Sequence, residues 1–272
     1  MEGLLSKVRQ HLVSMPRVQI LSDLHLEVGD QYSAFTFPVS APFLLLGGDI
    51  GRLIDYDAYR GFLQAQVVRY RRVFLVLGNH EFYGLDYPSG LEAAQRLSKE
   101  PTLTNGLSSL TILGCTLWSA IPADSSSVVE AKVNDFKKIE LWSVQKHNQL
   151  HTEEVDWLRD RVVQVMTDAA SGKSRLLIAT HHAPCIEGTS RPEHTSNPWT
   201  SAFATDLIDG NGWEGVKVWV FGHTHYSSRF VRDGIRVVSN QRGYVLPGAT
   251  RAMGGSKSKH RQEFDASMVI TV

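Results

Sequence analysis

The sequence predicts an α/β protein with a parallel sheet. Short apolar runs without alternation recur along the chain and are typical of strands that are covered on both faces. A segment of helical length separates two of the early runs, and strand–helix–strand order favours parallel pairing with a right-handed crossover. Most of these runs stop at polar residues. The polar side chains therefore gather where open α/β sheets place their functional sites.

Length and composition indicate one soluble globular protein. The chain has 272 residues, of which 42% are hydrophobic and 21% charged, and this is enough to bury a sizeable core. We find no internal repeat and no convincing linker, so we expect a single domain over residues 1–272. Lys and Arg number 28 against 28 Asp and Glu, and this balance gives no reason to expect nucleic acid or an anionic membrane as a partner.

Cysteine usage and the N-terminus predict a cytoplasmic protein. Cys115 and Cys185 lie far apart and in no metal-ligand spacing, which favours two free thiols in a reducing compartment. Lys7, Arg9 and His11 interrupt the N-terminal apolar stripe, so no signal-peptide core is expected. No stretch approaches the roughly 20 apolar residues of a transmembrane helix.

The first two predicted strands each end in candidate metal ligands. Residues 17–21 form the first strand, and Asp23 and His25 follow it with the i, i+2 spacing that places two extended residues on one side. Residues 43–46 form the second strand. The glycines at 47 and 48 permit a tight turn there and leave Asp49 at the strand end.

The next strand gives the chain its most informative ending. A helix is predicted over residues 55–72, and a buried strand over residues 73–77 then stops at Gly78-Asn79-His80-Glu81. An amide, an imidazole and a carboxylate in succession offer a metal ligand, a general acid and a group to orient that acid.

The middle of the chain is less regular. A short helix is expected over 91–98, followed by a strand near 110–118 in which Gly114 predicts a bend or bulge. Residues 121–148 read as a loop, and a loop of this length in a compact domain is either functional or wrongly assigned. We interpret it as a flap over the site, with Lys137 and Lys138 as candidate substrate contacts. The alternative is a solvated connection that touches no substrate.

The second half repeats the pattern of strands that end in histidines. Thr152 is the expected N-cap of a helix that ends near 171–172. The strand at 175–179 leads to His181 and His182, whose side chains point to opposite faces, so at most one of them joins a given site. A polar loop at 190–201 follows and contains His194.

The last predicted core strand, at 216–221, ends in Gly222-His223-Thr224-His225. A hairpin is expected over 229–239, with its turn at Asp233-Gly234. Asn240 and Arg242 either shape the cleft or hold this hairpin, and the structural role is favoured. Residues 254–262 read as a polar, mobile segment, and residues 268–272 read as a final strand.

Oxygen and imidazole ligands without a thiolate characterise the collected strand ends. They comprise Asp23, His25, Asp49, Asn79, His80, His181, His223 and His225. This donor set favours Mn²⁺, Fe or Zn²⁺ over a cysteine-based structural zinc site. Its size exceeds what one ion needs and suits a pair of ions that share a ligand.

Taken in order, the motifs Asp-x-His, Gly-Asp, Gly-Asn-His-Glu, His and Gly-His-x-His resemble those of the calcineurin-like metallophosphoesterase superfamily over about residues 17–244. The resemblance is to the phosphodiesterase-like branch and an uncharacterised microbial and fungal group within it. It implies a four-layer α/β/β/α sandwich with the site at the strand C-termini. It also implies one metal on Asp23, His25 and His225, a second on Asn79, His181 and His223, and Asp49 bridging the two. His181 is preferred because the family's ligand directly follows the strand, and His182 is the alternative.

The resemblance also implies the chemistry. Two cations about 3.5–4 Å apart share a water, and the resulting bridging hydroxide attacks phosphorus in line with the leaving oxygen. His80 would assist the leaving group, with Glu81 as a candidate to orient its imidazole. Further candidates for substrate contact, or for support of the ligands, are His182, Arg52, Lys137, Lys138 and His194.

The leading hypothesis is a phosphodiesterase for a small soluble phosphodiester, for which a nucleotide is one candidate. A phosphomonoesterase, including a protein phosphatase, is the alternative, but the paired arginines of the protein phosphatases are missing; Arg52 follows Asp49, and nothing comparable follows Glu81. A non-catalytic scaffold with this fold would have lost ligands. A repair nuclease would show a basic track. Loops 121–148 and 186–201 would set the leaving-group specificity.

Overall fold

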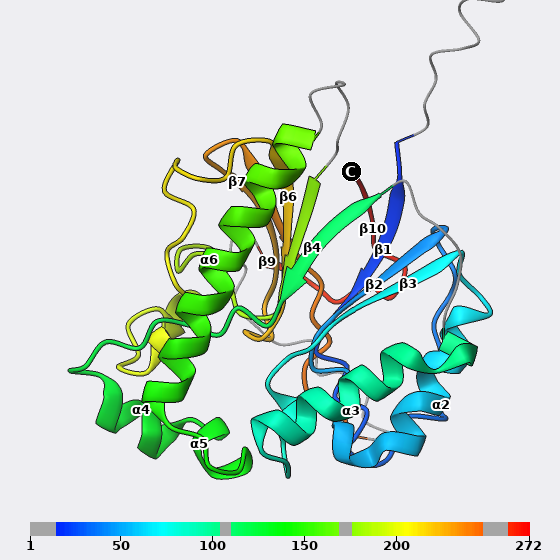
Figure 1. The fold of residues 1–272 in the computed structure, drawn as a ribbon, viewed down its shortest axis with the longest axis horizontal. Coiled ribbons are helices and arrows are strands. Elements are labelled where there is room, and N and C mark those ends of the chain that lie inside the picture. Colours follow the sequence, from blue (N-terminus) through cyan, green and yellow to red (C-terminus); the bar gives the residue numbers. More distant parts are fainter. Residues whose placement is uncertain (1–14, 104–109, 169–175, 247–260) are drawn as a thin grey trace, which may run out of the picture.

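Two sheets packed face to face form the centre of the computed structural model, which describes residues 15–103, 110–168, 176–246 and 261–272 (Figure 1). The first sheet has the strand order β10-β1-β2-β3. Its strands are β1 (Arg17–Leu21), β2 (Phe43–Gly47), β3 (Arg72–Val76) and β10 (Val269–Thr271). Strands β1, β2 and β3 run parallel, as predicted, and β10 adds antiparallel to β1.

The second sheet has the order β4-β5-β6-β8-β7-β9, and its first four strands are parallel. The strands are β4 (Thr111–Cys115), β5 (Leu176–Thr180), β6 (Val216–Phe221), β7 (Ser227–Arg232), β8 (Ile235–Ser239) and β9 (Arg261–Gln262). The predicted hairpin is confirmed as β7–β8, with the positive φ angles of its two-residue turn, 48° and 77°, at Asp233 and Gly234. The N-terminal stripe and residues 254–260 lie outside the described residues.

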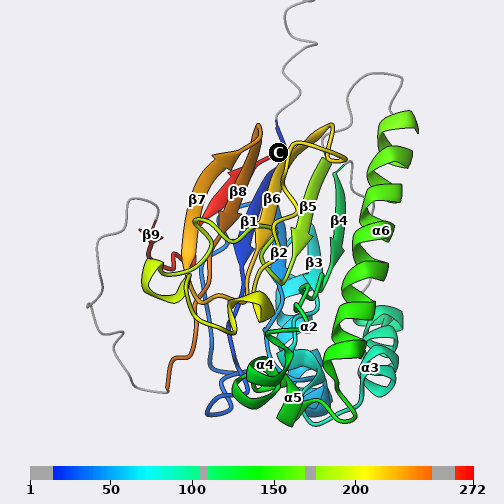
Figure 2. The ribbon, with the colours of Figure 1, turned by 90° about the vertical axis from the view of Figure 1, so that its left-hand side faces the viewer.

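Helices cover both outer faces, which confirms the four-layer α/β/β/α sandwich (Figures 1 and 2). Helices α2 (Tyr56–Val67) and α3 (Tyr87–Lys99) pack on the first sheet, and the long α6 (Val144–Asp168) packs on the second. Apolar side chains from both sheets, among them Ile20, Leu45 and Val220, fill the space between them. Burial of each such side chain contributes about 1.5–3 kcal/mol. None of the helices in the described ranges is long and apolar enough to cross a membrane.

Strand β3 is less buried than its sequence predicts. Its residues are half-buried up to Val76 because β3 is the edge of the first sheet, so one side has no neighbouring strand. Both faces are nevertheless covered: Val73 packs towards the helices and Phe74 towards the other sheet.

The predicted bend at Gly114 is wrong. Strand β4 runs through this residue and pairs with β5 without a register shift. A Cβ atom at Gly114 would lie 2.9 Å from the Ala179 carbonyl oxygen and 2.9 Å from Val76 Cγ2. The glycine is therefore needed for close packing between the sheets, not for a change of chain direction.

Residues 121–148 form short helices, not an extended loop. They contain α4 (Ser126–Lys132), α5 (Asp135–Lys138) and the start of α6. The predicted N-cap at Thr152 is also wrong, because Thr152 lies inside α6 and its hydroxyl donates to the Asn148 carbonyl oxygen. The hydroxyl of Ser143 instead accepts from the Lys146 N–H at 3.2 Å, which is the N-cap geometry.

Short 3₁₀ helices make up the remaining regular structure of the described residues. They are η1 (Leu53–Asp55), η2 (His80–Phe82), η3 (Pro101–Leu103), η5 (Pro192–His194) and η6 (Thr200–Ala202). Because β1, β2, β3, β5 and β6 run in one direction, their carboxyl ends meet at one edge of the sandwich. The segments that follow these strands carry the predicted ligands.

Candidate metal centre

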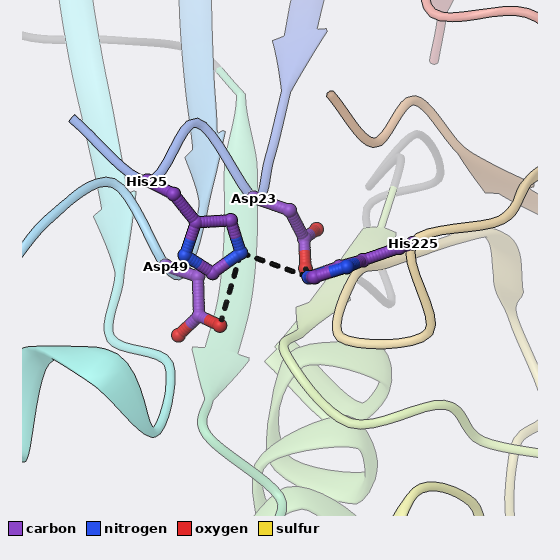
Figure 3. A group of neighbouring side chains, drawn as sticks. All are labelled: Asp23, His25, Asp49 and His225. Carbon is purple, nitrogen blue, oxygen red and sulfur yellow. Dashed lines mark hydrogen bonds and ion pairs between the residues drawn. The ribbon is translucent and has the colours of Figure 1, made fainter. Parts of the chain in front are cut away.

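The first cluster at this edge contains Asp23, His25, Asp49 and His225, whose side chains converge (Figure 3). The Nε2 atoms of His25 and His225 are 2.8 Å apart. His25 Nε2 lies 3.8 Å from Asp49 Oδ2, and His225 Nε2 lies 3.6 Å from Asp23 Oδ1. The Asp23 and His25 side chains are fully buried. This group could hold one metal ion.

The second cluster contains Asp49, His181 and His223, with Asn79 beside them. His181 Nε2 is 3.3 Å from Asp49 Oδ1 and 3.0 Å from Asn79 Oδ1. Asp49 thus presents one carboxylate oxygen to each cluster. The geometry suits two ions that share this aspartate, and His181, not His182, is the histidine that lies in the second cluster beside His223.

The backbone is held in an unusual conformation at these residues. Asp23, His25, Asp49, His223 and His225 all have positive φ, between 47° and 71°. Such left-handed conformations cost of the order of 1–3 kcal/mol each for residues other than glycine and cluster at functional sites. Five of them at this one edge of the sandwich indicate that the backbone there is constrained to direct the side chains of the two clusters.

The close approach of the two loops explains why glycine precedes Asp49. A Cβ atom at Gly48 would lie 2.3 Å from His181 Nδ1, and Gly48 itself has a φ of 89°. Only glycine combines that conformation with that contact. The turn after β2 can therefore pass directly under the His181 imidazole.

Unpaired buried atoms indicate that the donors fit a cation. Asp23 Oδ2 and His223 Nε2 are buried and have no hydrogen-bond partner among the described residues. Burial raises the pKa of Asp23, so its charge is costly without a counter-ion. Burial, with His25 alongside, lowers the pKa of His225 to about 3, so its imidazole is neutral and available as a ligand.

The pKa of His181 points the same way. Burial opposes a charge on this ring, but the Asp49 carboxylate outweighs that effect and raises the pKa of His181 to about 10. Conversely, burial would raise the pKa of Asp49, whereas His181 and His80 lower it well below its usual value. A divalent ion between these atoms would take the place of the proton.

Asp135 and Tyr83 hold the amide of Asn79, and neither was predicted from the sequence. Asn79 Nδ2 donates to Asp135 Oδ1 at 2.7 Å and contacts the Tyr83 hydroxyl at 3.1 Å. Tyr83 donates to the same Asp135 oxygen at 2.7 Å. These contacts turn the Asn79 amide oxygen towards His181. Asp135 therefore orients a candidate ligand and need not touch the ion itself.

Asp135→Ala should weaken the second metal position while sparing the first. We expect about a 10–100-fold lower affinity for one of two ions, as is typical when a partner of a metal ligand is removed. Metal titration followed by calorimetry would measure this change. Asp124→Ala, in the same segment but exposed, is the matched control. Unchanged affinity for both ions would show that Asn79 needs no such support.

His80 lies between the clusters and a third carboxylate. Its Nδ1 is 2.8 Å from Glu27 Oε1, its Nε2 is 3.0 Å from the Tyr244 hydroxyl, and its backbone N–H donates to Asp49 Oδ1. His80 Nε2 is 3.9 Å from Asp49 Oδ2. The imidazole thus faces the shared aspartate from the side, which suits contact with substrate.

The expectation that Glu81 orients His80 is wrong. The buried Glu81 carboxylate accepts hydrogen bonds from the N–H groups of Asp49, Ile50 and Gly78, and from the Tyr59 hydroxyl. It therefore ties the segments after β2 and β3 together, because the turn into η2 directs it away from the imidazole. The carboxylate beside the His80 imidazole is instead that of Glu27, whose Oε1 lies 2.8 Å from His80 Nδ1. One sequence feature could have identified Glu27: it continues the i, i+2 spacing of Asp23 and His25.

The other predicted candidates lie in different places. His182 is buried, stacks on His223 with ring centroids 4.0 Å apart, and contacts the Thr116 carbonyl oxygen. Arg52 is paired with Asp55 and lines a hollow of about 480 Å³ that also includes Glu27.

The remaining candidates and the hairpin residues lie outside the two clusters. The Lys137 ammonium donates to the Ala131 carbonyl oxygen, and Lys138 is exposed. His194 lines a small hollow beside Thr224. Asn240 bonds the Ile20 and Asp265 carbonyl oxygens, in keeping with its expected structural role.

The protein has four layers, and two clusters of carboxylates and imidazoles share one aspartate in an arrangement suited to two metal ions. The chain belongs to the calcineurin-like phosphoesterase family, whose model matches residues 16–227. Members of this family depend on divalent metals.

One protein sequence and one solved structure are similar to this chain over most of its length. An uncharacterised protein, L509, of Acanthamoeba polyphaga mimivirus is 28% identical over 256 residues, which cover 84% of this chain and 91% of the relative. The crystal structure of the phosphopantetheinyl hydrolase PptH of Mycobacterium tuberculosis superposes with a TM-score of 0.60 at 20% identity, covering 85% of this chain and 90% of that one. The latter similarity concerns the fold.

Proposed function

We propose that this protein is a phosphodiesterase that hydrolyses a small, soluble phosphodiester with two divalent ions. The observation that carries the proposal is the shared Asp49 carboxylate, with Oδ1 3.3 Å from His181 Nε2 and Oδ2 3.8 Å from His25 Nε2. One such bridge between two ligand clusters suits a pair of ions that together stabilise an in-line displacement at phosphorus.

Seven residues would hold the ions. Asp23, His25 and His225 would hold one, Asn79, His181 and His223 the other, and Asp49 both. With no thiolate present, Mn²⁺, Fe or Zn²⁺ suits the donor set. When bound, the ions activate a water molecule as the nucleophile and neutralise charge on the phosphoryl oxygens.

The protein's own residues perform the remaining steps. His80 would donate a proton from Nε2 to the leaving oxygen, because this atom faces Asp49 and touches the half-exposed Tyr244 hydroxyl. The substrate's oxygen would replace that hydroxyl as the partner of His80.

Charge balance favours a diester over a monoester. A phosphomonoester has a second pKa near about 6 and carries up to two charges at neutral pH, whereas a diester carries one. Arg52, one of the candidates for substrate contact, bonds Asp55 through two nitrogen atoms. Arg242 bonds the Leu24 carbonyl oxygen and Gln31. Both arginines are engaged in holding loops, which supports a substrate that needs less positive charge.

A small hollow beside the second cluster supports a small substrate. Its volume is about 80 Å³, and its lining includes Trp199, Phe203 and Thr224. Phe203 stacks on His223, with ring centroids 4.7 Å apart, and Thr224 separates His223 from His225. An ester group bound at the ions would reach this hollow and the predicted 186–201 specificity loop.

Comparison of bis(4-nitrophenyl) phosphate with 4-nitrophenyl phosphate, with Mn²⁺ present, tests the proposal. We expect kcat/KM to be about tenfold or more higher for the diester, equivalent to about 1.4 kcal/mol of transition-state stabilisation. The Asp49→Ala variant is the control for metal-dependent turnover. A monoester preference would instead establish a phosphomonoesterase, and bound ions without hydrolysis of either ester would point to the scaffold.

A further inference from the structure

We propose that Glu27 is a positioning residue that orients the metal-site His25 and the acid His80 through one carboxylate oxygen. The inference rests on the proposed function, because it takes His80 as the group that serves the leaving oxygen. It adds a physical link between metal binding and the placement of that acid. Neither the sequence motifs nor the two ligand clusters include Glu27.

The contacts of Glu27 carry the inference. Its Oε1 lies 2.8 Å from His80 Nδ1 and 3.3 Å from His25 Nδ1. The side chains of Glu27, His25 and His80 are only 8%, 0% and 9% exposed, so water competes little for these contacts. The two rings are close, with centroids 4.4 Å apart and planes at 66°. One oxygen atom therefore fixes two imidazoles relative to each other.

The choice of ring nitrogen follows from the acceptor. A carboxylate that accepts from Nδ1 places a proton there, so Nε2 of a neutral His25 keeps its lone pair for an ion, whereas the acid His80 carries its second proton on Nε2. The Nε2 atoms of His25 and His80 then lie 3.8 Å and 3.9 Å from the same oxygen, Asp49 Oδ2. Glu27 thus directs both rings towards the shared aspartate. Partners of this kind are known to fix ligand orientation in metal sites.

The backbone around Glu27 is tied to the Asp49 turn. The N–H groups of Asp23, His25 and Leu26 donate to the carbonyl oxygens of residues 48, 49 and 50, at 3.0, 3.0 and 2.9 Å. This ladder holds the whole segment against the shared aspartate. The position of Glu27 is therefore set before a ligand binds, as preorganisation requires.

Glu27, His25 and His80 also lie close enough to surround an ion of their own. Two observations favour hydrogen bonding instead. The 2.8 Å separation from His80 is an ordinary N–H···O distance, and the same oxygen already faces both nitrogens. The inference therefore predicts two ions per chain, not three, in the metal-saturated protein.

Glu27→Ala removes the acceptor, and Glu27→Gln retains one carbonyl oxygen of similar position. We expect Glu27→Ala to lower the affinity for one ion by about 10–100-fold, with Glu27→Gln recovering much of that loss. Metal titration followed by calorimetry measures this directly, without any substrate. Asp30→Asn, an exposed carboxylate in the same loop, is the matched control and should leave the affinity unchanged.

The effect of Glu27 on His80 is tested by a double-mutant cycle that combines Glu27→Ala with His80→Ala at saturating Mn²⁺. Glu27→Ala alone should reduce kcat by about 10-fold or more on a phenyl ester, and less on a 4-nitrophenyl ester whose leaving group needs no proton. Added to His80→Ala, it should cost nothing further. Additive losses, equal losses for Glu27→Ala and Glu27→Gln, or a third ion that is lost with Glu27 would each overturn the inference.

These outcomes are separate from the choice of substrate. If the wild-type protein prefers monoesters, the same cycle runs on phenyl and 4-nitrophenyl phosphate and the proposed function fails alone. If it hydrolyses neither class, the metal titration of Glu27→Ala still tests whether Glu27 orients His25: weakened affinity supports that role, and unchanged affinity contradicts it.

Discussion

Replacement of Asp49 by alanine should remove both metal ions and reduce phosphoester hydrolysis by at least about 10³-fold, since the ions supply several kcal/mol of charge stabilisation. The reason is that Asp49 faces both clusters, with one oxygen 3.3 Å from His181 and the other 3.8 Å from His25. Loss of any other ligand would disturb one cluster only. Elemental analysis of the desalted protein and the rate with bis(4-nitrophenyl) phosphate measure the two effects.

Asp57→Ala is the matched control for this substitution, because its carboxylate is 88% exposed and lies in the following helix, α2. The control should keep both ions and the wild-type rate. Retention of two ions by the Asp49→Ala variant would contradict the shared-ligand assignment. Circular dichroism would show that each variant is folded.

His80→Ala should give the opposite pattern: both ions retained and turnover reduced by about 10²–10⁴-fold, the usual contribution of a general acid. His80 contacts Glu27 and Tyr244 through its ring nitrogens and faces Asp49 from 3.9 Å, outside the two clusters. Because the substrate would still bind the ions, the loss should fall on kcat more than on KM.

Comparison of leaving groups sharpens the test of His80. The loss should be larger for a phenyl than for a 4-nitrophenyl ester. His194 is exposed and lines the small hollow, so His194→Ala is the control: it should keep both the bound ions and the wild-type turnover. Normal turnover of His80→Ala on both esters would exclude His80 as the acid.

Local pattern was sufficient for the strands and for the residues that follow them. An apolar run that stops at glycine and then at Asp, Asn or His needs no distant information, and β1 and β6 have the predicted bounds. The layers and the pairing of Asp23 with His225 depend on how the strands are ordered. Local pattern could not predict the layers or this pairing, because 200 residues separate His25 from His225. Both were predicted from the resemblance of the motifs to a known family.

Contacts between distant segments account for what the sequence did not reveal. Asp135 acts on Asn79 across 56 residues, from a four-residue helix that shows no clear periodicity. Helix α6 begins earlier than expected because His147 and His151 lie on its buried face. Because histidine is not an apolar residue, the buried face of the first turns shows no apolar periodicity in the sequence. Thr152 is a residue type that often caps helices, so the predicted start was placed there, too late in the chain.

The division of the ligands between the two sheets has a consequence for the life of the protein. The first sheet supplies Asp23, His25, Asp49 and Asn79, and the second supplies His181, His223 and His225. Each ion bound here would take ligands from both sheets and would therefore cross-link the two halves of the chain. Ligands that bind only the folded state stabilise it according to their free concentration. Loss of the metals would thus lower the stability of the contact between the two sheets and shorten the protein's lifetime, even where no substrate is present.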